Sequence, residues 1–148
     1  MEGGRQTAWR AQAIPRRAQL RLSGSAYVDS SCIVAIALEE TTAGMLATRI
    51  RGFTTISAHP LLDAEVRSAC SRDGAPLPDA ELATIDWVEV PRPLSEELDR
   101  ILTARYLRGA DCLHVATALY MSPDARELTF LTLDERQRSV AKKLGFKV

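Results

Sequence analysis

Lysine is almost absent from this chain: it occurs at three of 148 positions, Lys142, Lys143 and Lys147. Lysine and arginine together number 19, as do aspartate and glutamate, so the formal net charge is zero. A neutral chain does not hold nucleic acid by bulk charge, and any such binding needs a local basic patch. The composition, 46% hydrophobic and 26% charged, excludes a disordered chain and predicts one globular domain with its own core.

Cysteine pairs and long hydrophobic runs are also missing. Cys32, Cys70 and Cys112 are odd in number and form no Cys-x-x-Cys pair, which argues against a disulfide framework and against a zinc site. We expect them to be buried in a reducing compartment. The longest strongly apolar run, 32–38, is far shorter than the ~20 residues of a membrane span. No apolar export signal follows the basic N-terminus, so the expectation is a cytoplasmic protein without a membrane partner.

The first 24 residues differ in charge from the rest. Residues 1–24 contain five arginines and one acid, whereas residues 25–148 contain 14 basic and 18 acidic residues. Apolar residues show little periodicity in the first segment, so we expect a weakly ordered basic extension followed by one folded domain over 25–148. Two interpretations of the extension stay open, an arm that contacts RNA and a passive tail.

Short apolar segments alternate with helical patterns from Ser25 onward. Strands are expected at 26–28, 53–56, 86–90, 128–133 and 146–148, and helices at 32–42, 59–72, 79–84, 95–107, 110–121 and 135–143. Such alternation is typical of a parallel sheet that helices cover on both faces. The predicted fold class is therefore α/β, a three-layer α/β/α sandwich with a central, mostly parallel sheet.

Four carboxylates occupy positions that solvation alone does not explain. Asp29 and Asp134 each follow an apolar strand directly, and the carboxyl ends of parallel strands form the ligand-binding edge of α/β sheets. Glu65 and Asp111 lie on the apolar stripes of their helices. Buried carboxylates repel one another, so a cation has to compensate them. An all-oxygen donor set without lysine favours Mg²⁺ or Mn²⁺, and with it metal-assisted hydrolysis of a phosphodiester.

Each acid also has a purely structural interpretation. Helix capping explains Asp29 or Asp134 taken singly, and ion pairs with nearby arginines explain Glu65 or Asp111. Those arginines are Arg67, Arg105 and Arg108. Taken together, acids at two strand ends and on two helix stripes favour one shared site over four separate roles.

Four segments of the chain resemble the motifs of PIN-domain ribonucleases. They are Tyr27-Val28-Asp29-Ser30-Ser31, Ala64-Glu65-Val66, Gly109-Ala110-Asp111-Cys112-Leu113-His114-Val115-Ala116-Thr117-Ala118 and Leu131-Thr132-Leu133-Asp134. Their order and spacing match from about Ala26 to the C-terminus. Within the family, the chain is most similar to the VapC toxins of bacterial toxin–antitoxin systems. The basic extension departs from the family, whose members usually begin almost at the first strand.

The resemblance implies a PIN-like nuclease domain and a Mg²⁺- or Mn²⁺-dependent endoribonuclease. The roles it implies are Asp29 and Asp111 for the metal, Glu65 and Asp134 for catalysis, and Thr132 and Ser30 for hydrogen-bond support. It also implies RNA as the substrate, a homodimer, and a small VapB-like antitoxin that occludes the site. A toxin of this kind inhibits translation or growth.

Other functions stay open. They are a housekeeping PIN nuclease of RNA maturation, an aspartate phosphoacceptor domain and a catalytically silent binding module. The phosphoacceptor is less favoured, because Asp29 is followed by Ser30 and Ser31, without the second aspartate that one such pattern needs, and no lysine follows a late strand.

Several further side chains have both a structural and a functional interpretation. We expect His114 to be a packed helix histidine rather than a general acid, because a metal supplies the activated water without a base. We expect Trp87 and Tyr106 to pack in the core rather than stack on a base. The arginines that could contact phosphate are Arg49, Arg51, Arg72, Arg105, Arg108, Arg136 and Arg138.

Overall fold

The computed structural model describes residues 24–148. The expected basic extension therefore lies, apart from Gly24, outside the described residues. The helices are α1 (Ser30–Ala37), α2 (Ala43–Arg51), α3 (Leu61–Asp73), α4 (Asp79–Leu82), α5 (Ser95–Ala104), α6 (Gly109–Met121) and α7 (Glu135–Leu144), with a 3₁₀ turn, η1, at Ala125–Glu127. The strands are β1 (Ser25–Val28), β2 (Thr55–Ala58), β3 (Ile85–Trp87) and β4 (Leu128–Leu131).

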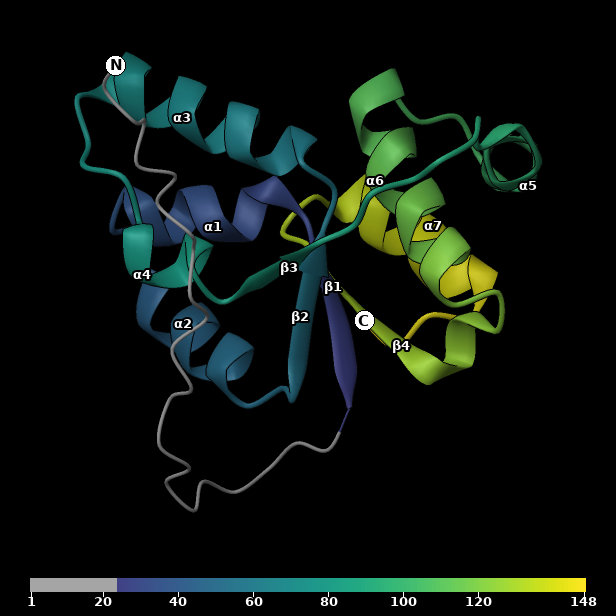
Figure 1. The fold of residues 1–148 in the computed structure, drawn as a ribbon, viewed down its shortest axis with the longest axis horizontal. Coiled ribbons are helices and arrows are strands. Elements are labelled where there is room, and N and C mark those ends of the chain that lie inside the picture. Colours follow the sequence, from purple (N-terminus) through teal and green to yellow (C-terminus); the bar gives the residue numbers. More distant parts are fainter. Residues whose placement is uncertain (1–23) are drawn as a thin grey trace, which may run out of the picture.

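These four strands form one parallel sheet in the order β3-β2-β1-β4. β1 is central, and its Ala26 pairs with Ile56 of β2 and with Thr129 of β4. Parallel neighbours need crossover connections. Here the crossovers carry helices to both faces, with α1–α4 on one side and α5–α7 on the other (Figure 1). The predicted α/β/α sandwich around a parallel sheet is confirmed.

Successive residues of β1 face two separate cores. Tyr27 lies in the core formed with α5–α7, where its ring stacks on Phe130 with the centroids 5.4 Å apart. Ala26 and Val28 lie in the other core with residues of α1–α3. A strand produces this alternation because its side chains point to opposite faces in turn. β1 is therefore buried on both faces and forms a rigid support for Asp29, the residue that follows it.

One helix, α2, has no counterpart among the sequence predictions. The predicted helix 32–42 is shorter than expected, because the backbone turns at Glu39, whose φ of 53° is left-handed. The pattern of α2 is weak because only Leu46 and Ile50 are buried and Thr42 makes no side-chain capping hydrogen bond. No helix within residues 24–148 has the length and apolar character that a membrane span needs.

Other boundaries also differ from the predictions. The predicted helix 95–107 ends at Ala104, because Arg105 is extended (φ −171°, ψ 153°), and an irregular link leads to α6. The expected strand 146–148 is reduced to a single bridge between Lys147 and Thr129. The early end of α5 leaves Tyr106 in that link rather than in a helix.

Candidate active site

Asp29 and Asp134 lie at the carboxyl ends of neighbouring strands, β1 and β4. The backbone N–H of Asp29 donates to the carbonyl of Leu131 over 2.9 Å, so the ladder between the strands continues to the first acid. Asp29 Oδ2 accepts from the N–H of Ser31 at 3.2 Å. Asp134 Oδ1 accepts from the N–H of Gln137 at 2.8 Å. The capping interpretation is confirmed for both acids, and the caps fix both carboxylates at one edge of the sheet while using one oxygen of each.

Glu65 reaches the same edge from α3 and is held by a chain of hydrogen bonds that begins at Tyr27. The Tyr27 hydroxyl accepts from the N–H of His59 at 3.0 Å and lies 2.7 Å from His114 Nδ1. His114 Nε2 lies 2.9 Å from Glu65 Oε1. An ionised Glu65 can only accept, so a neutral His114 carries its proton on Nε2 and donates it to Glu65. Its Nδ1 then accepts from the Tyr27 hydroxyl. Ser30 Oγ donates to the other carboxylate oxygen, Oε2.

These contacts keep Glu65 ionised. Burial raises the pKa of Glu65, but the hydrogen bonds from His114 and Ser30 outweigh burial and hold that pKa below its ordinary value. The imidazole of His114 is fully buried, and its Nε2 also lies 3.6 Å from Asp29 Oδ1. The expectation of a packed histidine is confirmed, and its neighbours are two of the predicted site acids.

Gln137, which the sequence analysis did not single out, is completely buried among the acids. Its Oε1 accepts from Thr132 Oγ1 at 2.7 Å. Its Nε2 lies 3.3 Å from the backbone carbonyl of Asp111 and 3.5 Å from Asp29 Oδ1. Thr132 Oγ1 is also 3.2 Å from Asp29 Oδ2, and its single proton serves one acceptor at a time. One amide thus connects the ends of β1 and β4 with the start of α6.

The sequence does contain one signal for Gln137. It is the third residue after the helix cap Asp134, the position where Glu or Gln completes a capping box. In the structure its amide turns inward to the acids and Thr132.

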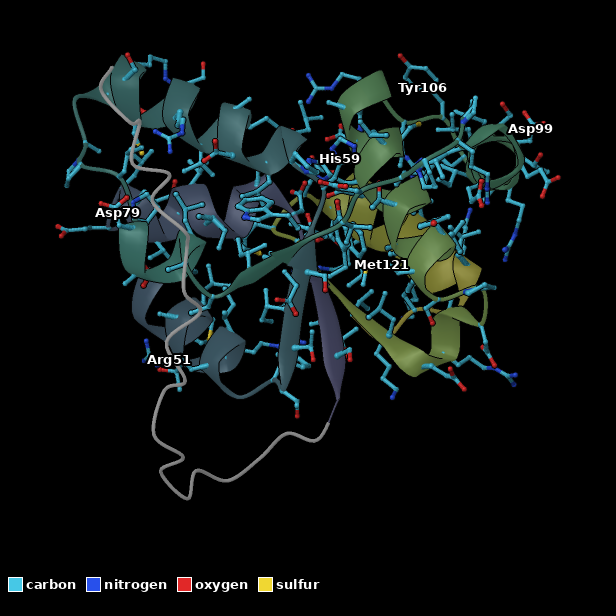
Figure 2. All side chains as sticks on the ribbon, viewed as in Figure 1. Arg51, His59, Asp79, Asp99, Tyr106 and Met121 are labelled. Atoms are coloured by element: carbon cyan, nitrogen blue, oxygen red, sulfur yellow. The ribbon has the colours of Figure 1, made fainter. Side chains whose placement is uncertain are left out.

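Asp111 and Asp134 line one pocket at this edge. The pocket has a volume of about 290 Å³, and its walls include Tyr106, Arg108 and Arg136. Arg108 Nε lies 3.5 Å from Asp111 Oδ2, but the Arg108 side chain is 78% exposed, so water screens this pair. Figure 2 shows Tyr106 at the outer edge of the molecule, on the link between α5 and α6.

Asp111 is influenced by the neighbouring negative charges. Burial raises the pKa of Asp111, and the carboxylates of Asp134 and Asp29 raise it further, while Arg108 opposes this only in part. Asp134 and Asp29 are therefore each close enough to Asp111 to repel its charge. A divalent cation among them would remove that repulsion.

The donor chemistry fits a hard divalent cation, although the side chains do not form a closed cage. In the part of the chain that the structure describes, no three His, Cys, Asp or Glu side chains are grouped so that they hold a metal ion by themselves. Mg²⁺ does not need such a group, because it keeps several waters and is usually bound through one or two carboxylates. The side chains of Thr132 and Gln137 that contact Asp29 are uncharged, so they leave its negative charge for a cation.

Comparison with known families agrees with this geometry. The model of the PIN domain matches residues 26–143, so the chain belongs to the PIN-domain family. PIN domains are typically metal-dependent nucleases that act on nucleic acid. No curated protein and no solved structure matches the chain significantly. Membership of this family favours a nuclease over an aspartate phosphoacceptor.

The remaining sequence predictions have mixed outcomes. The three cysteines are free and buried, as expected. Arg67 pairs with Asp63 at 2.9 Å rather than with Glu65. The prediction that Tyr106 packs in the core is wrong: its side chain is 71% exposed, because α5 ends early and the link that follows places the ring at the pocket. Trp87 is 40% exposed and is not a core residue either.

Proposed function

We propose that this PIN domain is a Mg²⁺- or Mn²⁺-dependent endoribonuclease that hydrolyses phosphodiester bonds in RNA. The observation that carries the proposal is the surroundings of Asp111: burial raises its pKa, the charges of Asp134 and Asp29 raise it further, and Asp111 and Asp134 line one pocket. In this proposal Asp29 and Asp111 hold the ion. An ion held there would supply positive charge to the phosphate and would acidify a water molecule.

Glu65 and Asp134 are the catalytic acids of the proposal. Glu65 is ionised at neutral pH because hydrogen bonds lower its pKa, and each carboxylate oxygen keeps a lone pair that can accept a proton from water. Asp134 lines the pocket beside Asp111, with one oxygen engaged in capping α7. The two acids thus approach the reacting phosphate from different elements, α3 and the end of β4.

Cleavage of end-labelled RNA by the purified protein tests the reaction. We expect cutting in Mg²⁺ or Mn²⁺ and none in EDTA. Asp111→Asn removes one charge with little change in shape, and we expect it to reduce the rate by about 100-fold or more. Asp63→Asn, which alters an exposed ion pair on α3, is the matched control and should cut like the wild type. Cutting in EDTA, or full activity of Asp111→Asn, contradicts the proposal.

We also propose that the protein is the toxin of a toxin–antitoxin pair and that it acts in the cytoplasm as a homodimer. A small VapB-like antitoxin would inhibit it by covering the site. The four motifs that resemble VapC toxins support this role. Expression in a bacterium should arrest growth, Asp111→Asn should not, and co-expression of a small protein encoded directly upstream should restore growth. Cleavage in vitro without growth arrest would favour RNA maturation instead.

A further inference from the structure

Tyr106 is the most exposed large hydrophobic side chain among the described residues, at 71%. It stands in the irregular link between α5 and α6, which exists because α5 ends at Ala104 and Arg105 is extended. Water contact on a large aromatic ring is unfavourable. A single exposed ring is common on protein surfaces, but Tyr106 also lines the pocket that holds Asp111 and Asp134, which places it where a ligand of that pocket would lie.

The pocket beside Tyr106 combines acidic side chains, arginines and an aromatic ring, all of which can contact a nucleotide. Its acids, Asp111 and Asp134, belong to the proposed catalytic set. Its arginines, Arg108 and Arg136, are exposed; Arg108 makes only a long, water-screened contact with Asp111 at 3.5 Å, so both guanidinium groups can reach phosphate oxygens. Its volume, about 290 Å³, lies at the lower end of ligand pockets, which begin at ~300 Å³. The hollow is therefore suited to one nucleotide unit rather than to a folded partner.

We propose that Tyr106 is a stacking platform for an unpaired RNA base next to the bond that is cut, and that Arg108 and Arg136 contact the flanking phosphates. This inference rests on the nuclease function proposed above and assigns to Tyr106 the contact with an unpaired base. In a duplex each base is stacked between its neighbours, so its face is not available to a side chain. Stacking on an aromatic ring adds affinity with little sequence preference.

Trp87 provides a comparison within the same molecule. It is 40% exposed and lines a separate hollow of about 860 Å³ beside α3 and α4. The acids of that hollow are Asp63, Asp79 and Glu89. They outnumber the single arginine of that hollow, Arg67, which is already paired with Asp63 at 2.9 Å, whereas the pocket beside Tyr106 has as many arginines as acids. Of these two exposed aromatic side chains, Tyr106 is therefore the one whose surroundings fit RNA.

Fluorescence anisotropy in EDTA measures this contact without cleavage. The probes are a fluorescein-labelled 12-nucleotide RNA of randomised sequence and a 12-base-pair RNA duplex, titrated with the full chain. We expect Tyr106→Ala to weaken single-strand binding at least tenfold and duplex binding less than twofold. Tyr106→Phe keeps the ring and should stay within twofold of the wild type. Trp87→Ala is the matched control and should also stay within twofold.

Each alternative outcome identifies what fails. Unchanged single-strand affinity in Tyr106→Ala, or an equal loss for strand and duplex, overturns the stacking role. A change of oligomeric state in light scattering without a change in RNA affinity also overturns it, and assigns the ring to a subunit interface. In those cases the cleavage assay with Asp111→Asn still tests the proposed nuclease activity independently of the role of Tyr106. A wild-type protein that binds neither probe and cuts no RNA contradicts the proposed function itself.

Discussion

His114 Nε2 lies 2.9 Å from Glu65 Oε1, while its Nδ1 lies 2.7 Å from the hydroxyl of Tyr27. One fully buried imidazole thus ties an acid on α3 to the central strand β1. Asp29 follows that strand and lies 3.6 Å from the same Nε2. The same ring therefore holds Glu65 by a hydrogen bond and lies beside Asp29.

Replacing His114 tests whether Glu65 depends on this hydrogen bond. His114→Ala removes the donor, and we expect kcat for RNA cleavage to fall about 10- to 100-fold with little change in KM. His114→Gln places an amide nitrogen near the position of Nε2 and should recover part of the loss. Cleavage kinetics give kcat and KM, and circular dichroism verifies folding. A folded His114→Ala protein with wild-type kcat contradicts the positioning role.

Gln137→Leu keeps the approximate volume of the side chain but removes the amide that joins Asp29, Thr132 and the backbone of Asp111. We expect the Kd for Mn²⁺ to rise about tenfold, because Asp29 loses part of its support. Isothermal titration calorimetry measures this Kd. Thr48→Val, on the exposed face of α2, is the control and should leave it unchanged. Equal Kd values for Gln137→Leu and the wild type would show that the amide does not position the acids.

Asp111→Asn should stabilise the metal-free protein at neutral pH. Burial and then the charges of Asp134 and Asp29 raise the pKa of Asp111, so the folded state binds this proton more tightly than the unfolded state. The free energy of unfolding of the wild type therefore falls as the pH rises from the ordinary aspartate pKa through the raised value. The asparagine of the variant does not titrate, so its stability does not fall in this way.

Thermal melts in EDTA measure that difference. We expect the Tm of Asp111→Asn to exceed that of the wild type by a few degrees at about pH 7.5. The two Tm values should converge below the ordinary aspartate pKa of ~3.9. Saturating Mg²⁺ should reverse the order at neutral pH, because the ion stabilises only the protein that binds it. A lower Tm for the variant in EDTA would mean that Asp111 is not under repulsion.

Tyr27→Phe preserves the stacking on Phe130 and removes one hydroxyl. That hydroxyl bonds to the N–H of His59 and to His114 Nδ1, and both lose a buried partner. We expect the free energy of unfolding to fall by about 1–3 kcal/mol. Urea denaturation measures it, with Tyr106→Phe on the surface as the control. A change below about 0.5 kcal/mol, the usual range for surface substitutions, would contradict the buried network.

The fold class and the acidic positions follow from local patterns in the sequence. Asp29 and Asp134 can be assigned to one sheet edge because each directly follows an apolar run of the sequence, although the predicted strand 128–133 is too long and β4 ends at Leu131. α2 is not visible in the pattern because only two of its residues are buried. The sequence pattern predicts the end of α5 three residues too late, because Leu107 is buried and extends the apolar pattern beyond the helix.

The contacts that hold the acids in place depend on distant parts of the chain. Tyr27 and His114 are 87 positions apart, and Asp29 and Gln137 are 108 apart. Strand register and helix packing bring these residues together, and no spacing in the sequence encodes that. The exposure of Tyr106 likewise depends on the extended backbone of Arg105, which the sequence pattern does not indicate.

A divalent cation held by Asp29 and Asp111 is the centre of the proposed mechanism. Titration of the metal-free protein with Mn²⁺, followed by electron paramagnetic resonance of the free ion, tests it directly, with Asp63→Asn as the control variant. We predict saturable binding to the wild type and to the control, and at least tenfold weaker binding to Asp29→Asn and to Asp111→Asn. A wild-type protein that binds no Mn²⁺, or two folded variants that bind it as tightly as the wild type, would contradict the mechanism.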